Sequence, residues 1–318
     1  MTQFSRYLAT AALTFTSFAQ TAPIRSLEVR ILSTMLAGQG GIGEWGFAAV
    51  VEIDGRRILF DTGARPRTVL ENARELKVDL ASITDVILTH NHSDHTGGLV
   101  TLRRELARQN PKAVSRAYAA SGMFYSRGGP DGSEGNPMIA IRRDYEAAGG
   151  AFVESSKPVR IAPGAWLTGP VPRPNPERNW SGGGFLRRPG GERAEDNLPE
   201  DQSLVLDTTR GLVLISGCGH AGIINTVEHA RATVREAPVY AAIGGFHLFN
   251  ASDEHLAWTA EKLKSFGLRH FWGAHCTGIE TVYRMRQLAG LGRRESVVGA
   301  VGATFRLDRG IEAGAIAR

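Results

Sequence analysis

The feature of this 318-residue chain that most constrains its fold is a histidine-rich motif directly after an apolar segment. Residues 85–90 read DVILTH, which predicts a buried strand that ends at His90. His92, Asp94 and His95 follow within the next few residues. His90 and His92 lie two residues apart in extended chain, so both rings point to the same side and can approach one metal ion. Asp94 and His95 follow where the chain turns, and they are expected to face a second ion.

The ligand types in this motif restrict the choice of metal. Imidazole and carboxylate groups suit zinc, and also iron or manganese. We therefore predict one or two zinc ions, with iron or manganese as the alternatives. Gly97 and Gly98 follow the motif and allow the backbone to turn sharply beneath the ions. Since zinc takes about four ligands, other parts of the chain are expected to complete the site.

The order of the remaining segments predicts the fold class. Apolar and alternating stretches predict strands at 27–32, 47–53, 57–60, 203–207, 212–216, 239–243 and 269–272. Helical patterns occupy residues 66–76, 99–109, 223–235 and 255–266. Segments rich in strands thus lead twice into strand–helix units. This order favours an α/β fold, an αββα sandwich in which two packed β-sheets are flanked by helices.

The middle of the chain has a different composition. Residues 111–200 are rich in Gly, Pro and Arg, which is typical of turns and loops. We expect short strands there, such as one near 165–168, but no strong helix. The prediction is a single domain over residues 27–318 with a loop-rich insertion at about 111–200.

Two groups of motifs resemble known proteins. The H-x-H-x-D-H motif, preceded by LFDTG at residues 59–63, resembles the metallo-β-lactamase superfamily. Four later blocks are similar to the branch of 7,8-dihydropterin-6-yl-methyl-4-(β-D-ribofuranosyl)aminobenzene-5′-phosphate synthases. These blocks are DQSL (201–204), SGCGHAGI (216–223), GGFHL (244–248) and HCTG (275–278). The resemblance extends over residues 27–290 and implies an αββα sandwich with a metal site between the sheets.

The resemblance also implies a set of metal ligands. It assigns the first ion to His90, His92 and one later histidine, and the second ion to Asp94, His95 and His275. Strand ends near Ser216, Ile243 and Trp272 are each followed by a histidine. We assign His220 to the first ion, with His247 as the alternative. In this assignment His247 faces the substrate and acts as a general acid for the leaving group.

One position departs from the superfamily pattern. The aspartate that usually bridges the two ions is not seen, and Gly217 and Cys218 occupy its place. The Cys218 thiolate is one candidate ligand, a small buried apolar side chain is the favoured alternative, and Asp201 is another candidate bridge. The chain has two cysteines, Cys218 and Cys276, far apart in sequence, so no disulfide framework is predicted. Asp61 is expected to orient a ligand histidine.

The predicted function is that of a metal-dependent hydrolase. A metal-bound hydroxide, oriented by Asp94, would attack an ester, lactone or phosphoester. The alternatives are a transferase or synthase acting on a pterin and a ribofuranosylaminobenzene-phosphate-like compound, and a non-catalytic metal or ligand binder. The formal net charge of +5 suits a small, anionic substrate, whereas no Lys/Arg run indicates nucleic acid. Candidate residues for contacting the anion are Arg127, Arg173, Arg187 and Arg188.

The N-terminal segment resembles a secretory signal peptide. Residues 1–20 contain Arg6, then mainly small and apolar residues, and a small-x-small sequence at 17–19. The segment is too short and too rich in Thr and Ser to span a bilayer. We expect a periplasmic or secreted protein with no membrane segment in its mature form. A cytoplasmic location follows if the segment is not a signal peptide, and this would favour the synthase, whose substrates are intracellular.

Overall fold

The computed structural model describes residues 22–38, 40–128, 132–179 and 184–317. The predicted signal peptide at residues 1–20 lies outside the described residues. Within the described part of the chain, no helix has both the length and the apolar character that a membrane span requires.

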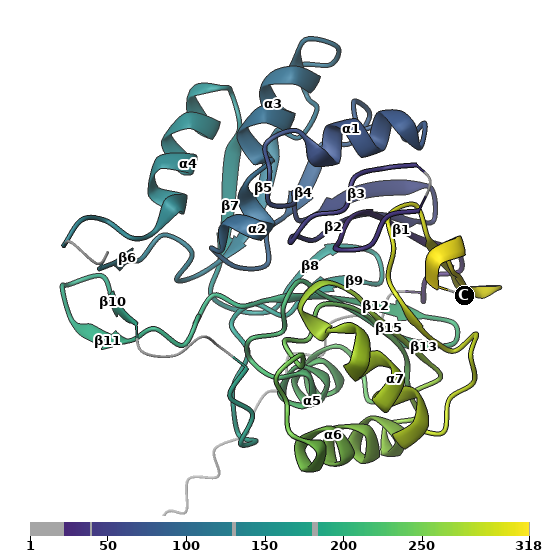
Figure 1. Cartoon of the computed structure of the whole chain (residues 1–318). Coiled ribbons are helices and arrows are strands. Elements are labelled where there is room, and N and C mark those ends of the chain that lie inside the picture. Colours follow the sequence, from purple (N-terminus) through teal and green to yellow (C-terminus); the bar gives the residue numbers. More distant parts are fainter. Residues whose placement is uncertain (1–21, 39, 129–131, 180–183, 318) are drawn as a thin grey trace, which may run out of the picture.

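The first large sheet has eight strands in the order β18-β17-β1-β2-β3-β4-β5-β7. Their bounds are β1 Leu27–Ser33, β2 Ala48–Ile53, β3 Arg56–Phe60, β4 Asp85–Ile87, β5 Arg116–Ala120, β7 Ala151–Ser155, β17 Thr304–Arg306 and β18 Gly310–Glu312. Strands β3, β4, β5 and β7 run parallel, so their carboxyl ends share one edge of the sheet. Helices α1 (Thr68–Glu75), α3 (Leu99–Ala107) and α4 (Pro137–Ala147) cover its outer face (Figure 1).

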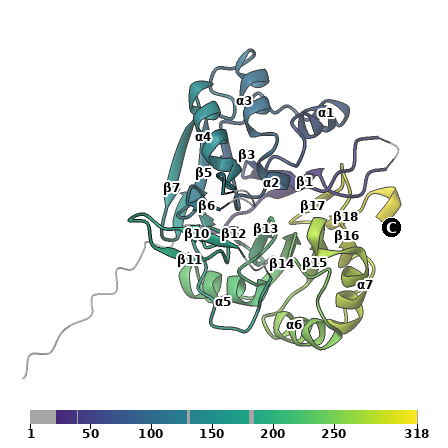
Figure 2. The ribbon, with the colours of Figure 1, turned by 60° about the vertical axis from the view of Figure 1, so that its left-hand side comes forward.

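The second large sheet has seven strands in the order β16-β15-β14-β13-β12-β9-β8. Their bounds are β8 Val159–Ala162, β9 Ala165–Leu167, β12 Ser203–Thr208, β13 Gly211–Ser216, β14 Val239–Gly244, β15 His270–Gly273 and β16 Ser296–Val298. Strands β13, β14, β15 and β16 run parallel to one another. Helices α5 (Ile223–Thr233), α6 (Asp253–Ser265) and α7 (Ile279–Leu288) cover the outer face of this sheet (Figures 1 and 2).

Apolar side chains of both sheets meet in one core between them. Ile31 and Phe60 reach it from the first sheet, and Ile215, Ile243 and Trp272 reach it from the second. A second apolar cluster lies between the first sheet and its helices, and a third lies between the second sheet and its helices. The arrangement buries one apolar face of each helix and both faces of the central strands, which is the reason for four layers. The predicted αββα sandwich is confirmed.

The middle stretch, residues 111–200, contains more regular structure than its composition predicts. It contributes strands to both large sheets, and it forms all three strands of a small sheet with the order β11-β10-β6. The small sheet consists of β6 Ser126–Arg127, β10 Phe185–Arg187 and β11 Arg193–Glu195. The expectation of no strong helix is wrong at α4. Asn136 caps this helix by accepting a hydrogen bond from the Met138 N–H, and Pro137 occupies its first turn.

Candidate metal centre

Loops from both sheets meet at one edge of the sandwich. Strand β4 leads into the loop that carries His90 and His92, and then into the short helix α2 (Ser93–Thr96). The loop after β13 carries His220, and β15 leads into the 3₁₀ helix η1 (His275–Thr277). Parallel strands present their carboxyl ends at one edge, so these loops converge although they are far apart in sequence.

The first cluster of candidate metal ligands consists of His90, His92 and His220. One ring nitrogen of each lies within 4.8 Å of the others. The Nδ1 of His220 donates a hydrogen bond to the Asn179 carbonyl oxygen, and the Nδ1 of His90 lies 3.0 Å from the Thr89 hydroxyl. The buried Nε2 atoms of His90 and His220 have no hydrogen-bond partner among the described residues. Such orphaned nitrogens facing one another fit a metal ion.

The second cluster consists of Asp94, His95 and His275. The His275 Nε2 lies 3.2 Å from an Asp94 carboxylate oxygen and 3.3 Å from the His95 Nε2. The Nδ1 of His95 lies 2.7 Å from Asp61 Oδ2, so this carboxylate fixes the ring with Nε2 toward the cluster. The predicted contact between Asp61 and a candidate ligand histidine is therefore present.

The charge states differ between the two clusters. Burial lowers the pKa of His92 to about 4, and burial together with neighbouring imidazoles lowers the pKa of His90 and of His220. These rings are therefore neutral at pH 7, as metal binding requires. Burial also opposes protonation of His95, but the Asp94 and Asp61 carboxylates outweigh it and raise its pKa to about 9. A metal ion at the second cluster would have to displace that proton.

Two cysteines lie against the second cluster. The Cys218 sulfur is 3.1 Å from the His95 Nε2, and it is 3.2 Å from the Cys276 sulfur. Sulfur atoms thus complete two further candidate donor sets, His90 with His95 and Cys218, and Cys218 with His275 and Cys276. Cys276 was not among the predicted donors, although its position next to His275 after a predicted strand was a signal for it.

Asp201, a predicted candidate for bridging the two ions, lies outside the two clusters of candidate ligands. Its carboxylate accepts a hydrogen bond from the Ala221 N–H. It belongs to none of the donor clusters found among residues 22–38, 40–128, 132–179 and 184–317. Burial raises the pKa of Asp201 to about 6. Its visible role is to hold the loop that carries His220.

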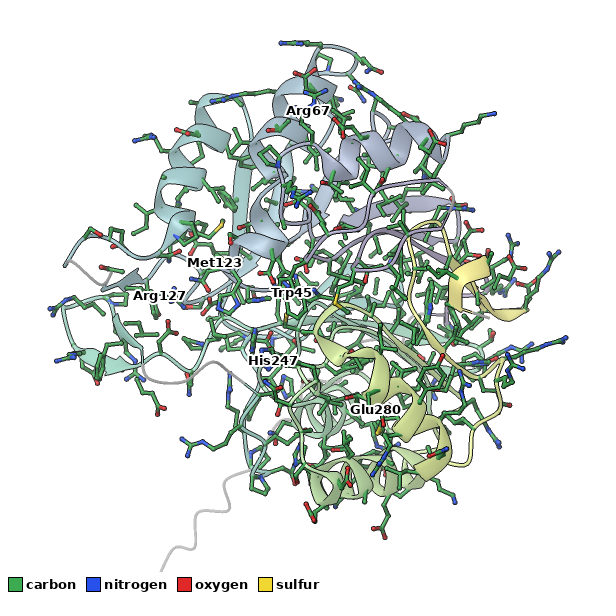
Figure 3. The ribbon with its side chains drawn as sticks, in the orientation of Figure 1. Trp45, Arg67, Met123, Arg127, His247 and Glu280 are labelled. Carbon is green, nitrogen blue, oxygen red and sulfur yellow. The ribbon has the colours of Figure 1, made fainter. Side chains whose placement is uncertain are left out.

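His247 lies beside the first cluster. Its ring centroid is 4.6 Å from that of His220, but it belongs to none of the donor clusters among the described residues. Its backbone adopts a left-handed φ of 48°, which is uncommon for a residue other than glycine. Figure 3 shows His247 and Trp45 near the boundary between the two halves of the sandwich, whereas Glu280 lies in the outer helical layer. The half-buried imidazole is thus close to the candidate ligands without joining them.

A cavity of about 810 Å³ opens beside the clusters. His92 and Asp94 line it, together with the half-exposed aromatic side chains of Trp45 and Phe185. Arg127 also reaches this cavity, but its guanidinium forms ion pairs with Asp196 and Glu200. The positive charge that Arg127 was expected to offer an anion is therefore balanced by the protein.

The other candidate arginines are also placed by the structure. Arg173 donates hydrogen bonds to the carbonyl oxygens of His220 and Leu198, so it holds the loop of a candidate ligand. Arg188 forms an exposed ion pair with Glu192, and Arg187 is exposed on β10. Neither Arg173 nor Arg188 is among the residues that line the cavity.

An αββα sandwich with adjoining His, Asp and Cys donors at one sheet edge defines a class of metal-binding proteins. The model of the metallo-beta-lactamase superfamily matches residues 46–228, and the chain belongs to this superfamily. Its members are mostly enzymes and typically bind metal ions, so the donor clusters lie in a fold that is known to use them.

Several relatives place the chain more narrowly. It is 32% identical to the 7,8-dihydropterin-6-methyl-4-(β-D-ribofuranosyl)-aminobenzene-5′-phosphate synthase of Methanocaldococcus jannaschii, over 74% of this chain and 80% of that protein. It is 29% identical to an uncharacterized protein of the same organism, over 82% of this chain and 94% of that protein. The crystal structure of Tm1679, a metal-dependent hydrolase of the β-lactamase superfamily, matches with a TM-score of 0.71 and 26% identity. That match covers 88% of this chain and 98% of Tm1679.

Proposed function

We propose that the protein is a metal-dependent hydrolase of an ester, lactone or phosphoester. The observation that carries the proposal is the pair of adjoining donor clusters, His90 with His92 and His220, and Asp94 with His95 and His275, beside an open cavity. When bound there, a metal ion would lower the pKa of a coordinated water and stabilise negative charge on the substrate.

The chain's own residues have distinct roles in this proposal. The three histidines of the first cluster would hold one ion, and the second cluster would hold another, with zinc as the proposed metal and iron or manganese as alternatives. Asp94 borders both the second cluster and the cavity. Its carboxylate is therefore suited to orient the attacking water. The half-buried His247 would donate a proton to the leaving group.

The second candidate function is a synthase or transferase. The similarity to the dihydropterin-ribofuranosylaminobenzene-phosphate synthase favours it. In that case the substrates of this chain would be a pterin and a ribofuranosylaminobenzene-phosphate-like compound. The cavity is compatible with both candidates, because Trp45 and Phe185 offer aromatic faces to a substrate.

The decisive experiment measures metal and activity on the same preparations. Elemental analysis of the purified protein should find zinc, iron or manganese. The double variant His90→Ala/His92→Ala should lose most of it, because an ion cannot lose two of about four ligands without a large drop in affinity. His255→Ala, on the remote helix α6, is the matched control and should keep the metal. Unchanged metal content in the double variant would refute the proposed site.

Substrate panels distinguish the two functions. The metal-loaded protein should cleave at least one of a set of phosphodiester, lactone, thioester and β-lactam compounds, and the double variant should not. Formation of a ribofuranosylaminobenzene-linked pterin product, without hydrolysis of any panel member, would favour the synthase instead.

The proposed location is the periplasm or the exterior of the cell. It depends on the signal peptide resemblance of residues 1–20. Expression in a host with a secretion system should yield a mature chain that begins near Gln20. N-terminal sequencing that finds Met1 or Thr2 on a cytoplasmic product would reject this location and favour the synthase.

A further inference from the structure

The two cysteines of the chain meet in space although 57 residues separate them in the sequence. Cys218 lies in the loop after β13, and Cys276 lies in η1 after β15. Their sulfur atoms are 3.2 Å apart, and both side chains are buried. Because these are the only cysteines of the sequence, any disulfide within one chain must join this pair.

A glycine directly after the intervening strand allows this approach. Strand β14 lies between β13 and β15, so their loops must close over its end. A Cβ at Gly245 would lie 1.9 Å from the Gly217 carbonyl oxygen and 2.9 Å from the Cys276 sulfur. Only a residue without a side chain therefore lets the two loops touch at this point.

The two thiols are also held by their neighbours. The Cys276 sulfur accepts a hydrogen bond from the His247 N–H, and the Cys218 sulfur lies 3.1 Å from the His95 Nε2. Both sulfurs are thus fixed next to candidate metal ligands. Bond formation between them needs a displacement of only about 1 Å.

We propose that Cys218 and Cys276 are a modification site, at which a peroxide forms a reversible disulfide inside the metal centre. In the balanced step, two S–H bonds and the O–O bond of hydrogen peroxide break, one S–S bond forms, and two water molecules leave. The sulfurs lose two electrons and the peroxide gains them. A thiol reductant reverses the modification by thiol–disulfide exchange.

The disulfide changes the donors available at the second cluster. Cys218 belongs to the donor set with His90 and His95, and both cysteines form a set with His275. Oxidation removes both thiols from these sets, so it should weaken metal binding at this side of the centre. Asp94 borders the open cavity and contacts His275. Both sulfurs are buried, so a molecule as small as hydrogen peroxide must pass Asp94 and His275 to reach them from the cavity.

The test treats the metal-loaded protein with hydrogen peroxide, denatures it and counts thiols. The count should fall from two per chain to zero, and dithiothreitol should restore both. Peptide mapping should find residues 218 and 276 in one cross-linked pair, and non-reducing electrophoresis should find monomers. Two persistent thiols, a loss that dithiothreitol does not reverse, or a disulfide between two chains would each overturn the proposal.

Single variants separate the pair from ordinary thiol oxidation. Cys218→Ser and Cys276→Ser each retain one thiol, so neither should yield the cross-linked peptide. If one variant fails to fold, the other variant and the wild-type peptide map still decide. Elemental analysis of the oxidised wild-type protein should find less metal per chain than in the untreated sample, with recovery after reduction and reloading. A confirmed disulfide with unchanged metal content would refute the effect on the centre.

Discussion

His220 and His247 have different surroundings, and therefore different expected roles, although their ring centroids are only 4.6 Å apart. The Asn179 carbonyl accepts a hydrogen bond from the His220 Nδ1, which leaves its buried Nε2 without a partner among the described residues. His247 is half-buried and joins no donor cluster in that part of the chain. A fixed tautomer with a free Nε2 is typical of a metal ligand, whereas burial lowers the pKa of His247, and its role as a proton donor stays a proposal.

Alanine variants of these two residues should therefore behave differently. His220→Ala should lower the metal bound per chain, because it removes one nitrogen of the first cluster. His247→Ala should keep the metal and lower turnover by about 10²–10⁴-fold, the range for loss of a general acid. Elemental analysis and steady-state kinetics on both variants check this. Metal loss in His247→Ala, with full occupancy in His220→Ala, would exchange the two assignments.

Asp61 is a second residue whose effect should appear through a neighbour. Its carboxylate accepts hydrogen bonds from the Thr89 N–H and hydroxyl and holds the His95 Nδ1. Asp61→Asn presents an amide to His95 and should lower metal affinity at the second cluster by roughly 10–100-fold. Competition with a chromophoric chelator measures this affinity. Asp79→Asn, remote from the site on an exposed turn, should leave it unchanged. Equal affinities in all three proteins would refute the orienting role.

The sequence predicted the donors of the candidate site from one dense motif and, through the family resemblance, from the two later histidines. The H-x-H-x-D-H motif predicted that four donors would gather after one strand, and the structure does bring them together with His220 and His275. Their binding of a metal stays a prediction. Cys276 was missed because its contact with Cys218 depends on strand order and on the close approach at Gly245. Neither feature is visible in local sequence.

At the scale of elements, periodicity predicted helices α1, α3, α5 and α6 and the central strands of both sheets, but not α7, outer strands such as β7 and β18, or α4, which is the informative case. Its flanking composition, rich in Gly and Arg, predicted loops. The local signal was Asn136 followed by Pro137, a helix cap and a first-turn proline. Met138 and Tyr145 then bury one face of the helix against the first sheet. Tertiary packing of these two side chains therefore stabilises a helix that composition alone disfavours.

Helix α5 depends on a distant carboxylate at its N-terminus. The two Glu177 oxygens accept hydrogen bonds from the Ile224 and Asn225 N–H groups. Asn179, two residues after Glu177, accepts a hydrogen bond from His220, so the segment that carries both residues links the helix to the candidate site. Burial raises the pKa of Glu177 to about 7, although the two backbone donors oppose the shift.

This raised pKa predicts a pH-dependent stability. The folded protein keeps the Glu177 proton up to about pH 7, whereas the unfolded chain releases it near its ordinary value of 4.5. The contribution to the free energy of unfolding is therefore complete below pH 4.5 and is lost as the pH rises toward 7. The free energy of unfolding should fall by at most roughly 3 kcal/mol over this pH range. The glutamine of Glu177→Gln cannot ionise, so the variant should not show this fall.

Urea denaturation of wild type and variant across this pH window measures the difference. The free energy of unfolding of the wild-type protein should fall relative to that of Glu177→Gln as the pH rises. The exposed side chain of Glu192 provides the control, because Glu192→Gln should follow the wild-type curve. Parallel curves for wild type and Glu177→Gln would show that the carboxyl group does not titrate in this window.

At the scale of the whole molecule, the candidate ligands come from both halves of the sandwich. His90, His92, Asp94 and His95 follow a strand of the first sheet, whereas His220 and His275 follow strands of the second. The cluster of His90, His92 and His220 and the cluster of Asp94, His95 and His275 each contain residues from both halves, whereas the donor set of Cys218, His275 and Cys276 comes from the second half alone. A metal ion at either cluster would therefore join the two sheets at the edge where their loops meet, and it would bind the folded state far better than the unfolded chain.

Metal removal should therefore lower the stability of the entire fold. At a free metal concentration of about 1,000 times Kd, binding adds about 4 kcal/mol to the free energy of unfolding. For a chain of this size such a loss corresponds to a fall in Tm of roughly 5–15 °C. Calorimetry of the protein before and after EDTA treatment, with zinc added back, measures it. The variant His90→Ala/His92→Ala should start at a lower Tm and respond less to EDTA. If EDTA lowers the Tm of wild type and variant by the same amount, the stabilising metal does not bind at the clusters that join the two sheets.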